Sequence, residues 1–225
     1  MPLTVRLDIV SDVMCPWCYI GKRRLEAAMA LVPELKFDIR WRPFQLDPTI
    51  PADGMDRQEY LTRKFGRTRA KEFYENIRQA GASEGIEFDF AAIEKSPNTV
   101  DAHRLIRWAA GAGCQDACVE MLFERYFIRG QDIGDKSVLV SVAGDCGMDA
   151  DLVGELLDGT KDVDLVSREF ALAQAMGIQG VPGFIFENNY LVSGAQAPES
   201  LADAAQRAAN APAEEGRPGP FDSRE

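Results

Sequence analysis

The sequence predicts an α/β protein in which a small mixed sheet carries helices and a large helical block is inserted between the two halves of the sheet. Residues 3–43 read as strand, helix and strand, residues 56–160 contain only helical patterns, and residues 162–209 read as helix, two short strands and helix. The chain has 225 residues, of which 46% are hydrophobic. A chain of this size and composition can bury a core without disulfides or metals.

The first half is predicted to be a β-α-β unit. Residues 3–10 alternate in polarity and are rich in β-branched residues, as is typical of a strand. From Pro16 the apolar positions recur at helical spacing, and the pattern ends before Pro33. Residues 36–43 alternate again. Such a unit favours a parallel pair of strands with a right-handed crossover.

A helical insertion is predicted to follow. The prolines and the glycine of residues 44–55 indicate a loop. Between about residue 56 and residue 160, six stretches have helical patterns and several end at glycine, as helix C-termini often do. No convincing strand pattern interrupts them. We therefore assign residues 50–161 to a helical insertion domain.

The last part of the chain is predicted to complete the sheet. Residues 162–176 have a helical pattern, and residues 184–186 and 190–192 are short strands around Asn188-Asn189, a dipeptide that suits a tight hairpin. Pro198 opens a final helix.

The sheet domain is therefore assigned to residues 1–49 and 162–210. Residues 211–225 have the composition of a flexible tail.

Charge and hydropathy limit the classes of partner. The formal net charge is −11, which argues against nucleic acids and anionic membranes because both bind basic surfaces. No apolar run approaches the length of a membrane span. The N-terminus lacks the basic start and continuous apolar stretch of a secretory signal. We therefore expect a cytoplasmic protein, in which a disulfide is more often catalytic than structural.

Cys15 and Cys18 are the strongest candidates for chemistry. Cys15 follows a predicted strand and lies near the N-cap of a predicted helix, where unpaired N–H groups and the helix dipole favour a thiolate. Cys18 lies one turn further on, on the face assigned to the core. This context predicts that Cys15 attacks a disulfide and Cys18 resolves the mixed disulfide. Pro16 stiffens the first turn, and Trp17 adds no positive charge, so the dipole has to stabilise the thiolate.

A zinc site is the structural alternative for this pair. Its other ligands would come from Cys114 and Cys118, with Cys146 or His103. A zinc knuckle usually lies between turns or short hairpins rather than at the start of a long amphipathic helix. We therefore favour redox chemistry and predict no metal site.

Three segments resemble the DsbA-like, FrnE-type thioredoxin-fold oxidoreductases: SDVMCPWCYIGKRRL, SPNTVDAHRLIRWA and GIQGVPGFIFENNYLVSGAQ. They occur in the family's order, and the resemblance extends to about residue 210. The relatives include disulfide oxidoreductases, 2-hydroxychromene-2-carboxylate isomerases and kappa-class glutathione transferases. The resemblance implies a thioredoxin fold with a helical insertion over the active site. It also implies thiol–disulfide exchange with a protein or a small-molecule substrate.

The resemblance further implies substrate-binding residues. Val181 and Pro182 match the family's cis-proline loop, which would face Cys15 and pair with an extended peptide or with glutathione in the manner of an added strand. Asn98 and His103 match a segment of the isomerase branch and are hypothesised to line the pocket. For His103 a structural hydrogen bond is the more common role of such a residue.

Two other functions remain open from the sequence. The isomerase branch typically has serine at the nucleophile position and uses glutathione, whereas this chain has Cys15 followed by a second thiol. Dithiol chemistry is therefore favoured over a glutathione-dependent isomerase or transferase, in which Cys18 would be dispensable. The other alternative is a non-enzymatic zinc-binding or chaperone-like module. We predict no bound cofactor, with glutathione as an alternative co-substrate, and the sequence leaves the oligomeric state open.

The remaining reactive or charged residues have simpler interpretations. Cys114 and Cys118 flank a predicted helix start and are interpreted as small buried hydrophobic residues, with a second redox pair as the alternative. Cys146 precedes a glycine and marks a helix end. The basic run at residues 22–24 is interpreted as a solvated helix face.

Overall fold

The computed structural model describes residues 3–211, 219 and 221, apart from the side chains of residues 67–71. The elements in chain order are β1 (Leu3–Ser11), α1 (Pro16–Leu31), β2 (Leu35–Pro43), β3 (Met55–Asp56), α2 (Arg57–Ser83), β4 (Lys95–Ser96), α3 (Val100–Gly111), α4 (Gln115–Phe127), α5 (Lys136–Asp145), α6 (Ala150–Asp158), α7 (Val163–Ala175), β5 (Gly183–Phe186), β6 (Tyr190–Ser193) and α8 (Pro198–Asn210).

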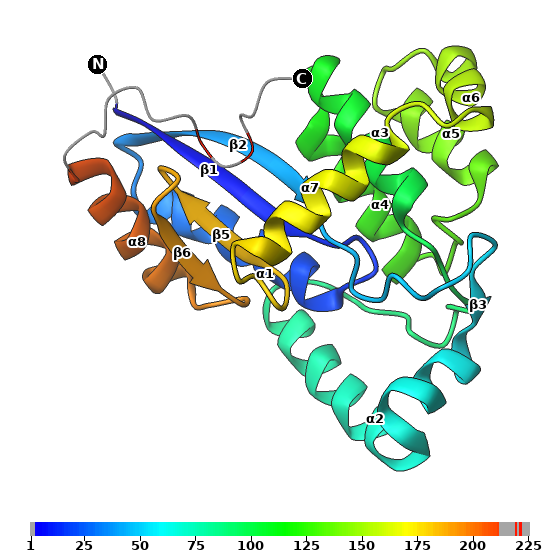
Figure 1. Cartoon of the computed structure of the whole chain (residues 1–225). Coiled ribbons are helices and arrows are strands. Elements are labelled where there is room, and N and C mark those ends of the chain that lie inside the picture. The colour runs from blue at the N-terminus through cyan, green and yellow to red at the C-terminus, as the bar shows by residue number, and fades with distance from the viewer. Residues whose placement is uncertain (1–2, 212–218, 220, 222–225) are drawn as a thin grey trace.

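Four strands form one mixed sheet in the order β2-β1-β5-β6 (Figure 1). β1 and β2 are parallel, β5 is antiparallel to β1, and β6 is antiparallel to β5. The predicted β-α-β unit and the predicted hairpin are therefore confirmed. The hairpin turn differs by one position, because the residues with positive φ are Glu187 and Asn188 rather than Asn188 and Asn189.

Helices cover both faces of the sheet. The core on one face contains Val5, Leu7 and Ile9 of β1 together with apolar residues of α1 and α8. The smaller core on the other face contains Val10 of β1 and Ala173 of α7. Alternate residues of β1 therefore serve opposite cores, as the period of a strand requires.

The insertion between β2 and α7 is helical, as predicted, except for one short pairing. β3 and β4 form a two-stranded antiparallel ladder that brackets α2. Two-residue strands are too short to produce an alternating pattern in the sequence. α2 is interrupted at Gly66, whose φ of 72° and ψ of 163° belong to a region that is essentially restricted to glycine.

The basic run at residues 22–24 is not a solvated face, and that prediction is wrong. The side chain of Lys22 is only 5% exposed and forms ion pairs with Glu26, Asp116 and Glu120. Asp116 and Glu120 belong to α4, so the run connects α1 to the insertion. The sequence does not reveal this contact because the partners are far apart in the chain.

The predicted flexible tail is anchored at its far end. Phe221 is buried in the smaller core, and the guanidinium carbon of Arg42 lies 4.9 Å from the centre of its ring. Gly219 is also buried. The rest of residues 212–225 lies outside the described part of the chain.

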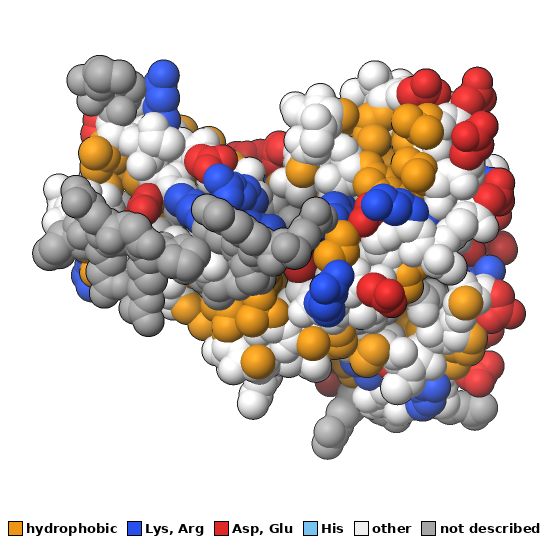
Figure 2. Space-filling model, turned by 45° about the horizontal axis from the view of Figure 1, so that its top comes forward, with side chains coloured by type: hydrophobic (Ala, Val, Ile, Leu, Met, Phe, Trp, Pro, Cys, Tyr) orange, Lys and Arg blue, Asp and Glu red, His pale blue; other side chains and the backbone are white. Residues whose placement is uncertain are grey.

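Charged side chains are unevenly distributed over one face of the molecule. On the face drawn in Figure 2, Asp and Glu side chains line the outer rim of the helical region, and Lys and Arg side chains gather nearer the middle of the molecule. Within the described residues, none of the helices combines the length and the apolarity needed to cross a bilayer.

A candidate dithiol active site

Cys15 is the N-cap residue of α1, in the turn that leaves β1. Its backbone N–H donates to the carbonyl of Asp12 at 3.0 Å, and its carbonyl accepts from the N–H of Cys18 at 3.0 Å. No side chain caps this helix end, and Pro16 stands in the first turn. The predicted context of strand, turn and helix is therefore confirmed. The unpaired N–H groups and the dipole of α1 act on the position of the Cys15 sulfur.

Cys18 is the buried member of the pair. Burial raises the pKa of Cys18 well above its usual value, and the hydrogen bond to Cys15 and the charge of Cys15 raise it further. The Ser11 side chain and the Asp12 backbone act in the opposite direction. Cys18 therefore keeps its proton at neutral pH.

The loop before β5 approaches the dithiol. The Sγ of Cys15 lies 3.7 Å from the carbonyl oxygen of Val181, in a weak S–H···O contact. The peptide bond between Val181 and Pro182 is cis. The Pro182 ring packs on α1 at Gly21, where a methyl group would lie 2.8 Å from the Cγ of Pro182. Glycine at position 21 is therefore required for this close approach.

A buried polar pair that the sequence did not predict lies behind the turn. The carboxylate of Asp12 is fully buried and accepts from the N–H of Leu46 at 2.6 Å. The Nε2 of His103 lies 2.9 Å from the carbonyl oxygen of Phe44 and 3.4 Å from the Oδ1 of Asp12. Contact with a carbonyl assigns the proton to Nε2, so His103 makes a structural hydrogen bond. The only signal for Asp12 in the sequence is a polar residue directly after a buried strand.

Asn98 uses its side chain to hold backbone. Its Nδ2 donates to the carbonyl of Ile50 at 2.8 Å, and its Oδ1 accepts from the N–H of Val100 at 3.1 Å. These contacts join the loop after β2 to the start of α3. Both polar atoms of the Asn98 side chain are thus engaged with backbone groups, so this arrangement does not support the hypothesis that Asn98 orients a substrate.

Lys64 of the insertion is influenced by charges of the dithiol turn. The Nζ of Lys64 in α2 donates to the hydroxyl of Tyr60 at 2.7 Å. Burial lowers the pKa of Lys64, while the charges of Asp47, Asp12 and Cys15 act in the opposite direction. Lys64 and Cys15 are therefore electrostatically coupled. The sequence contains no signal for the role of this residue, because its contact with the loop after β2 forms only in the folded chain.

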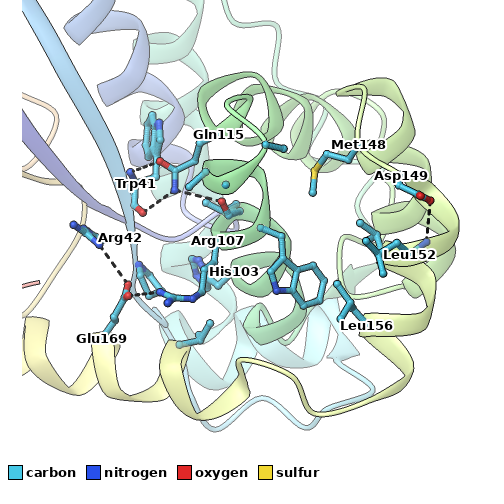
Figure 3. Close-up of a pocket in the computed structure, with 18 of the residues that line it drawn as sticks. Trp41, Arg42, His103, Arg107, Gln115, Met148, Asp149, Leu152, Leu156 and Glu169 are labelled. Carbon is cyan, nitrogen blue, oxygen red and sulfur yellow. Dashed lines mark hydrogen bonds and ion pairs between the residues drawn. The ribbon is translucent and has the colours of Figure 1, made fainter. Parts of the chain in front are cut away.

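A cavity of about 730 Å³ lies beside the dithiol turn without including it. The residues around it come from the end of β2, from α3, α6 and α7, from the start of α4 at Gln115 and from the loop between α5 and α6 (Figure 3). His103 forms part of its wall, whereas Cys15 and Val181 do not. Among the described residues, no cluster of three or more His, Cys, Asp or Glu side chains is arranged to hold a metal ion.

Comparison with known proteins identifies related chains. The family described as DSBA-like thioredoxin domain matches residues 6–206. The crystal structure of a probable DsbA oxidoreductase from Streptomyces coelicolor is similar with a TM-score of 0.82 and 31% sequence identity, and the likeness covers 91% of this chain and 89% of that chain.

Two further structures share the fold at lower identity. A 2-hydroxychromene-2-carboxylate isomerase has a TM-score of 0.69 and 14% identity, over 90% of this chain and 95% of that chain. The cytosolic disulfide reductase DsbM of Pseudomonas aeruginosa, solved with GSH, has a TM-score of 0.55 and 18% identity, over 91% and 95%. The predicted thioredoxin fold with a helical insertion is thereby confirmed.

Proposed function

This chain belongs to the DSBA-like thioredoxin domain family, and from that premise we propose that it is a thiol–disulfide oxidoreductase whose working dithiol is Cys15 and Cys18. The substrate is a disulfide or dithiol of a protein or a small molecule. The proposed chemistry needs no bound cofactor.

The proposed reaction has two exchange steps. The Cys15 thiolate attacks one sulfur of the substrate disulfide, which forms a mixed disulfide and releases the other sulfur as a thiolate that takes up a proton. Cys18 then loses its proton and attacks the Cys15 sulfur. This step releases the second substrate thiol and leaves the Cys15–Cys18 disulfide. Each of the two cysteines gives up one electron and one proton to the substrate.

The raised pKa of Cys18 fits this order of events. In the free enzyme the hydrogen bond and the charge of Cys15 help to keep Cys18 protonated. Once Cys15 is in a mixed disulfide, it carries no charge and its sulfur is a much weaker acceptor. Two of the three causes that raise the pKa of Cys18 then weaken, so Cys18 becomes a better nucleophile at the stage when it has to attack.

The single observation that carries the proposal is the position of Cys15, which is the N-cap residue of the helix that contains the buried Cys18 and has its sulfur 3.7 Å from the Val181 carbonyl oxygen. We propose that the backbone at Val181 and Pro182 pairs with the substrate. Trp17 is half-buried next to the dithiol and Pro16 is buried in the same turn. We propose that both contact the substrate.

Glutathione is the proposed small-molecule partner. The fold shared with a cytosolic disulfide reductase that was solved with GSH supports this proposal and a cytoplasmic location. Asn98 and His103 are retained only as residues that position the backbone around the site, because both are engaged with main-chain groups.

A redox titration in glutathione buffers tests the proposal. Thiol labelling and peptide mass spectrometry would follow the wild type and the variants Cys15→Ser and Cys18→Ser. We expect a reversible Cys15–Cys18 disulfide in the wild type and a persistent glutathione adduct on Cys15 in Cys18→Ser. A wild type that never forms the Cys15–Cys18 disulfide would exclude the dithiol mechanism.

A glutathione-dependent isomerase is the second candidate. Cys15 is only 4% exposed, which favours a small substrate over an extended protein segment, and the fold is shared with an isomerase. This candidate predicts that Cys18→Ser keeps full turnover, whereas the dithiol mechanism predicts that the same variant stops after one exchange. Turnover of Cys18→Ser therefore separates the two.

A further inference from the structure

The cavity beside the dithiol turn has a charged side that the proposed exchange chemistry does not use. Arg107 of α3 and Glu169 of α7 form an ion pair there, in which the Nη1 of Arg107 lies 2.7 Å from the Oε1 of Glu169. The Nη1 of Arg42, at the end of β2, lies 4.0 Å from the other oxygen of Glu169. Figure 3 shows these three side chains on one side of the cavity. Two guanidinium groups therefore share one carboxylate in this part of the wall.

Arg107 keeps hydrogen-bond donors for a ligand. Among the described residues, its side chain makes one hydrogen bond, from Nη1 to Glu169. The side chain is 34% exposed, so its remaining N–H groups are accessible. Arg42 is less available, because its Nε donates to the buried carboxylate of Asp8. The planar fork of N–H groups in arginine matches the geometry of a carboxylate. An anionic group in the cavity would therefore bind Arg107.

The other side of the cavity is apolar. Met148, in the loop before α6, and Leu152 and Leu156 of α6 line it, and Figure 3 shows them across the cavity from the arginines. Leu152 is 51% exposed although it is large and apolar. Asp149 also lines this side, but its carboxylate accepts from the N–H of Leu152 at 3.0 Å as the N-cap of α6. This wall therefore offers mainly aliphatic side chains to a ligand.

The size of the cavity suits a small molecule. Its volume of about 730 Å³ lies within the range of about 300–1,000 Å³ that is common for such sites. Sites of this kind combine an apolar lining with a few polar groups that fix the orientation of the ligand. Neither Cys15 nor Cys18 lines the cavity. A ligand bound here would therefore occupy a site separate from the dithiol.

From this arrangement we propose that the cavity binds a small molecule that has an aliphatic body and ends in a carboxylate, such as a medium-chain alkanoate. The carboxylate accepts hydrogen bonds from the remaining N–H groups of Arg107. The aliphatic body packs against Met148, Leu152 and Leu156. Binding is non-covalent and uses neither cysteine of the dithiol.

Octanoate is the probe that tests this proposal on the full chain. Titration calorimetry would compare octanoate with 1-octanol and octylammonium, which keep the aliphatic body and replace the carboxylate with a neutral or a cationic group. Trp41 and Trp108 line the cavity, so tryptophan fluorescence gives a second signal. We expect octanoate to bind about tenfold or more tightly than 1-octanol, and octylammonium to bind most weakly. No binding of octanoate, or equal affinities for the three probes, would overturn the proposal.

Substitution of Arg107 tests the polar contact. Arg107→Met should lower the affinity for octanoate by about tenfold or more and change that for 1-octanol by less than about twofold. Arg129 is also ion-paired with a glutamate but does not line the cavity. Arg129→Met is therefore the matched control and should bind octanoate as the wild type does. If Arg107 only holds Glu169 in place, Arg107→Met will bind octanoate and 1-octanol with the same preference as the wild type, which contradicts the proposal.

Substitution of Leu152 tests the apolar contact. Because Leu152 is exposed, Leu152→Glu should fold, and its charge should lower the affinity for octanoate by about tenfold or more. Leu31→Glu changes a leucine with a similar exposure of 54% at the end of α1 and should leave the affinity unchanged. Urea unfolding would confirm that each variant is folded. Unchanged binding in Leu152→Glu would place the ligand elsewhere. Binding should persist in Cys15→Ser/Cys18→Ser, so failure of the dithiol mechanism and failure of this proposal are distinguishable.

Discussion

At the residue scale, Gly21 determines how closely the loop at Val181 and Pro182 approaches the dithiol. A methyl group at this position would lie 2.8 Å from the Cγ of Pro182 and 3.2 Å from the Cζ of Phe184. Alanine is favoured over glycine inside a helix by about 1 kcal/mol. In Gly21→Ala this gain in helix propensity would therefore offset part of the stability lost through the clash. The gain in helix propensity does not, however, offset the displacement of the loop at Val181 and Pro182 that the methyl group would cause.

We therefore expect Gly21→Ala to slow thiol–disulfide exchange at Cys15 by about tenfold or more, because small displacements of binding groups are costly. Stopped-flow reaction with oxidised glutathione would measure the rate, and urea unfolding would measure the stability. Gly111→Ala is a suitable control, since a methyl group there meets nothing within 4 Å. Equal rates in wild type and Gly21→Ala would mean that the loop does not position the substrate.

The titration of Cys18 gives a second prediction for a single residue. Burial, the hydrogen bond to Cys15 and the charge of Cys15 raise the pKa of Cys18, in that order. Cys15→Ser removes the charge, so the pKa of Cys18 should fall toward its usual value although burial remains. Short-pulse alkylation across pH, followed by peptide mass spectrometry, should therefore place the labelling profile of Cys18 at lower pH in Cys15→Ser than in the wild type. Superimposable profiles would show that burial alone controls Cys18.

At the scale of elements, the ion pairs of Lys22 join α1 to α4. Burial lowers the pKa of Lys22, but the hydrogen bond to Glu26 and the charges of Asp116 and Glu120 outweigh this and raise it overall. The ammonium group of Lys22 therefore stays charged although it is buried. If this ammonium group is removed, the negatively charged carboxylates that it pairs with are left facing each other without a compensating charge.

We expect Lys22→Met to lower the free energy of unfolding by about 1–2 kcal/mol, which is less than for a fully buried pair because the carboxylates are partly exposed. Arg129→Met removes the exposed pair with Glu124 and should change stability by less than about 0.5 kcal/mol. Urea unfolding at low and high salt would compare the two variants. A loss in Arg129→Met as large as in Lys22→Met would contradict this assignment.

Elements with local signals were predictable from the sequence, and those that depend on distant partners were not. Alternation in residues 3–10 and helical spacing after Pro16 arise from neighbouring residues, so β1 and α1 were predicted closely. β3 and β4 are too short to carry a period. The burial of Lys22 and the anchoring of Phe221 depend on partners that the chain brings back from far away.

The candidate site follows the same division. Cys15 and Cys18 were predictable because their chemistry follows from the helix start that contains them. Val181 and Pro182 were expected only through resemblance to a family. Asp12 and Lys64 were missed, because a carboxylate after a strand or a lysine on a helix acquires a role only through tertiary contacts.

At the scale of the whole molecule, buried thiol and phenol groups with raised pKa values make the stability of the fold sensitive to high pH. Burial is a main cause of the raised pKa values of Cys18 and Tyr126, and the hydrogen bond to Cys146 is the first cause for Cys118. In the unfolded chain, thiols lose their protons at about pH 8.5 and phenols at about pH 10. The unfolded chain then holds fewer protons than the folded protein, so the free energy of unfolding falls as pH rises.

We expect the reduced protein to lose stability above about pH 8.5, and more steeply above about pH 10, by about 1.4 kcal/mol per pH unit for each such group. Urea unfolding at a series of pH values would measure the slope. Cys18→Ala removes one such group, so between about pH 8.5 and about pH 10 it should reduce the loss of unfolding free energy by about 1.4 kcal/mol per pH unit. A flat profile from neutral pH to about pH 10 would show that the buried thiols do not control stability.

The order of the sheet also bears on how the chain is made. β1 is a central strand, and its two neighbours are β2, which follows at once, and β5, which comes from the other end of the chain. During synthesis on the ribosome, β1, α1 and β2 emerge long before β5. One side of β1 is therefore without its native partner until nearly all of the chain has been translated, and an unpaired strand edge invites association with other chains. We therefore expect the nascent chain to be most prone to association with other chains while the insertion is being synthesised.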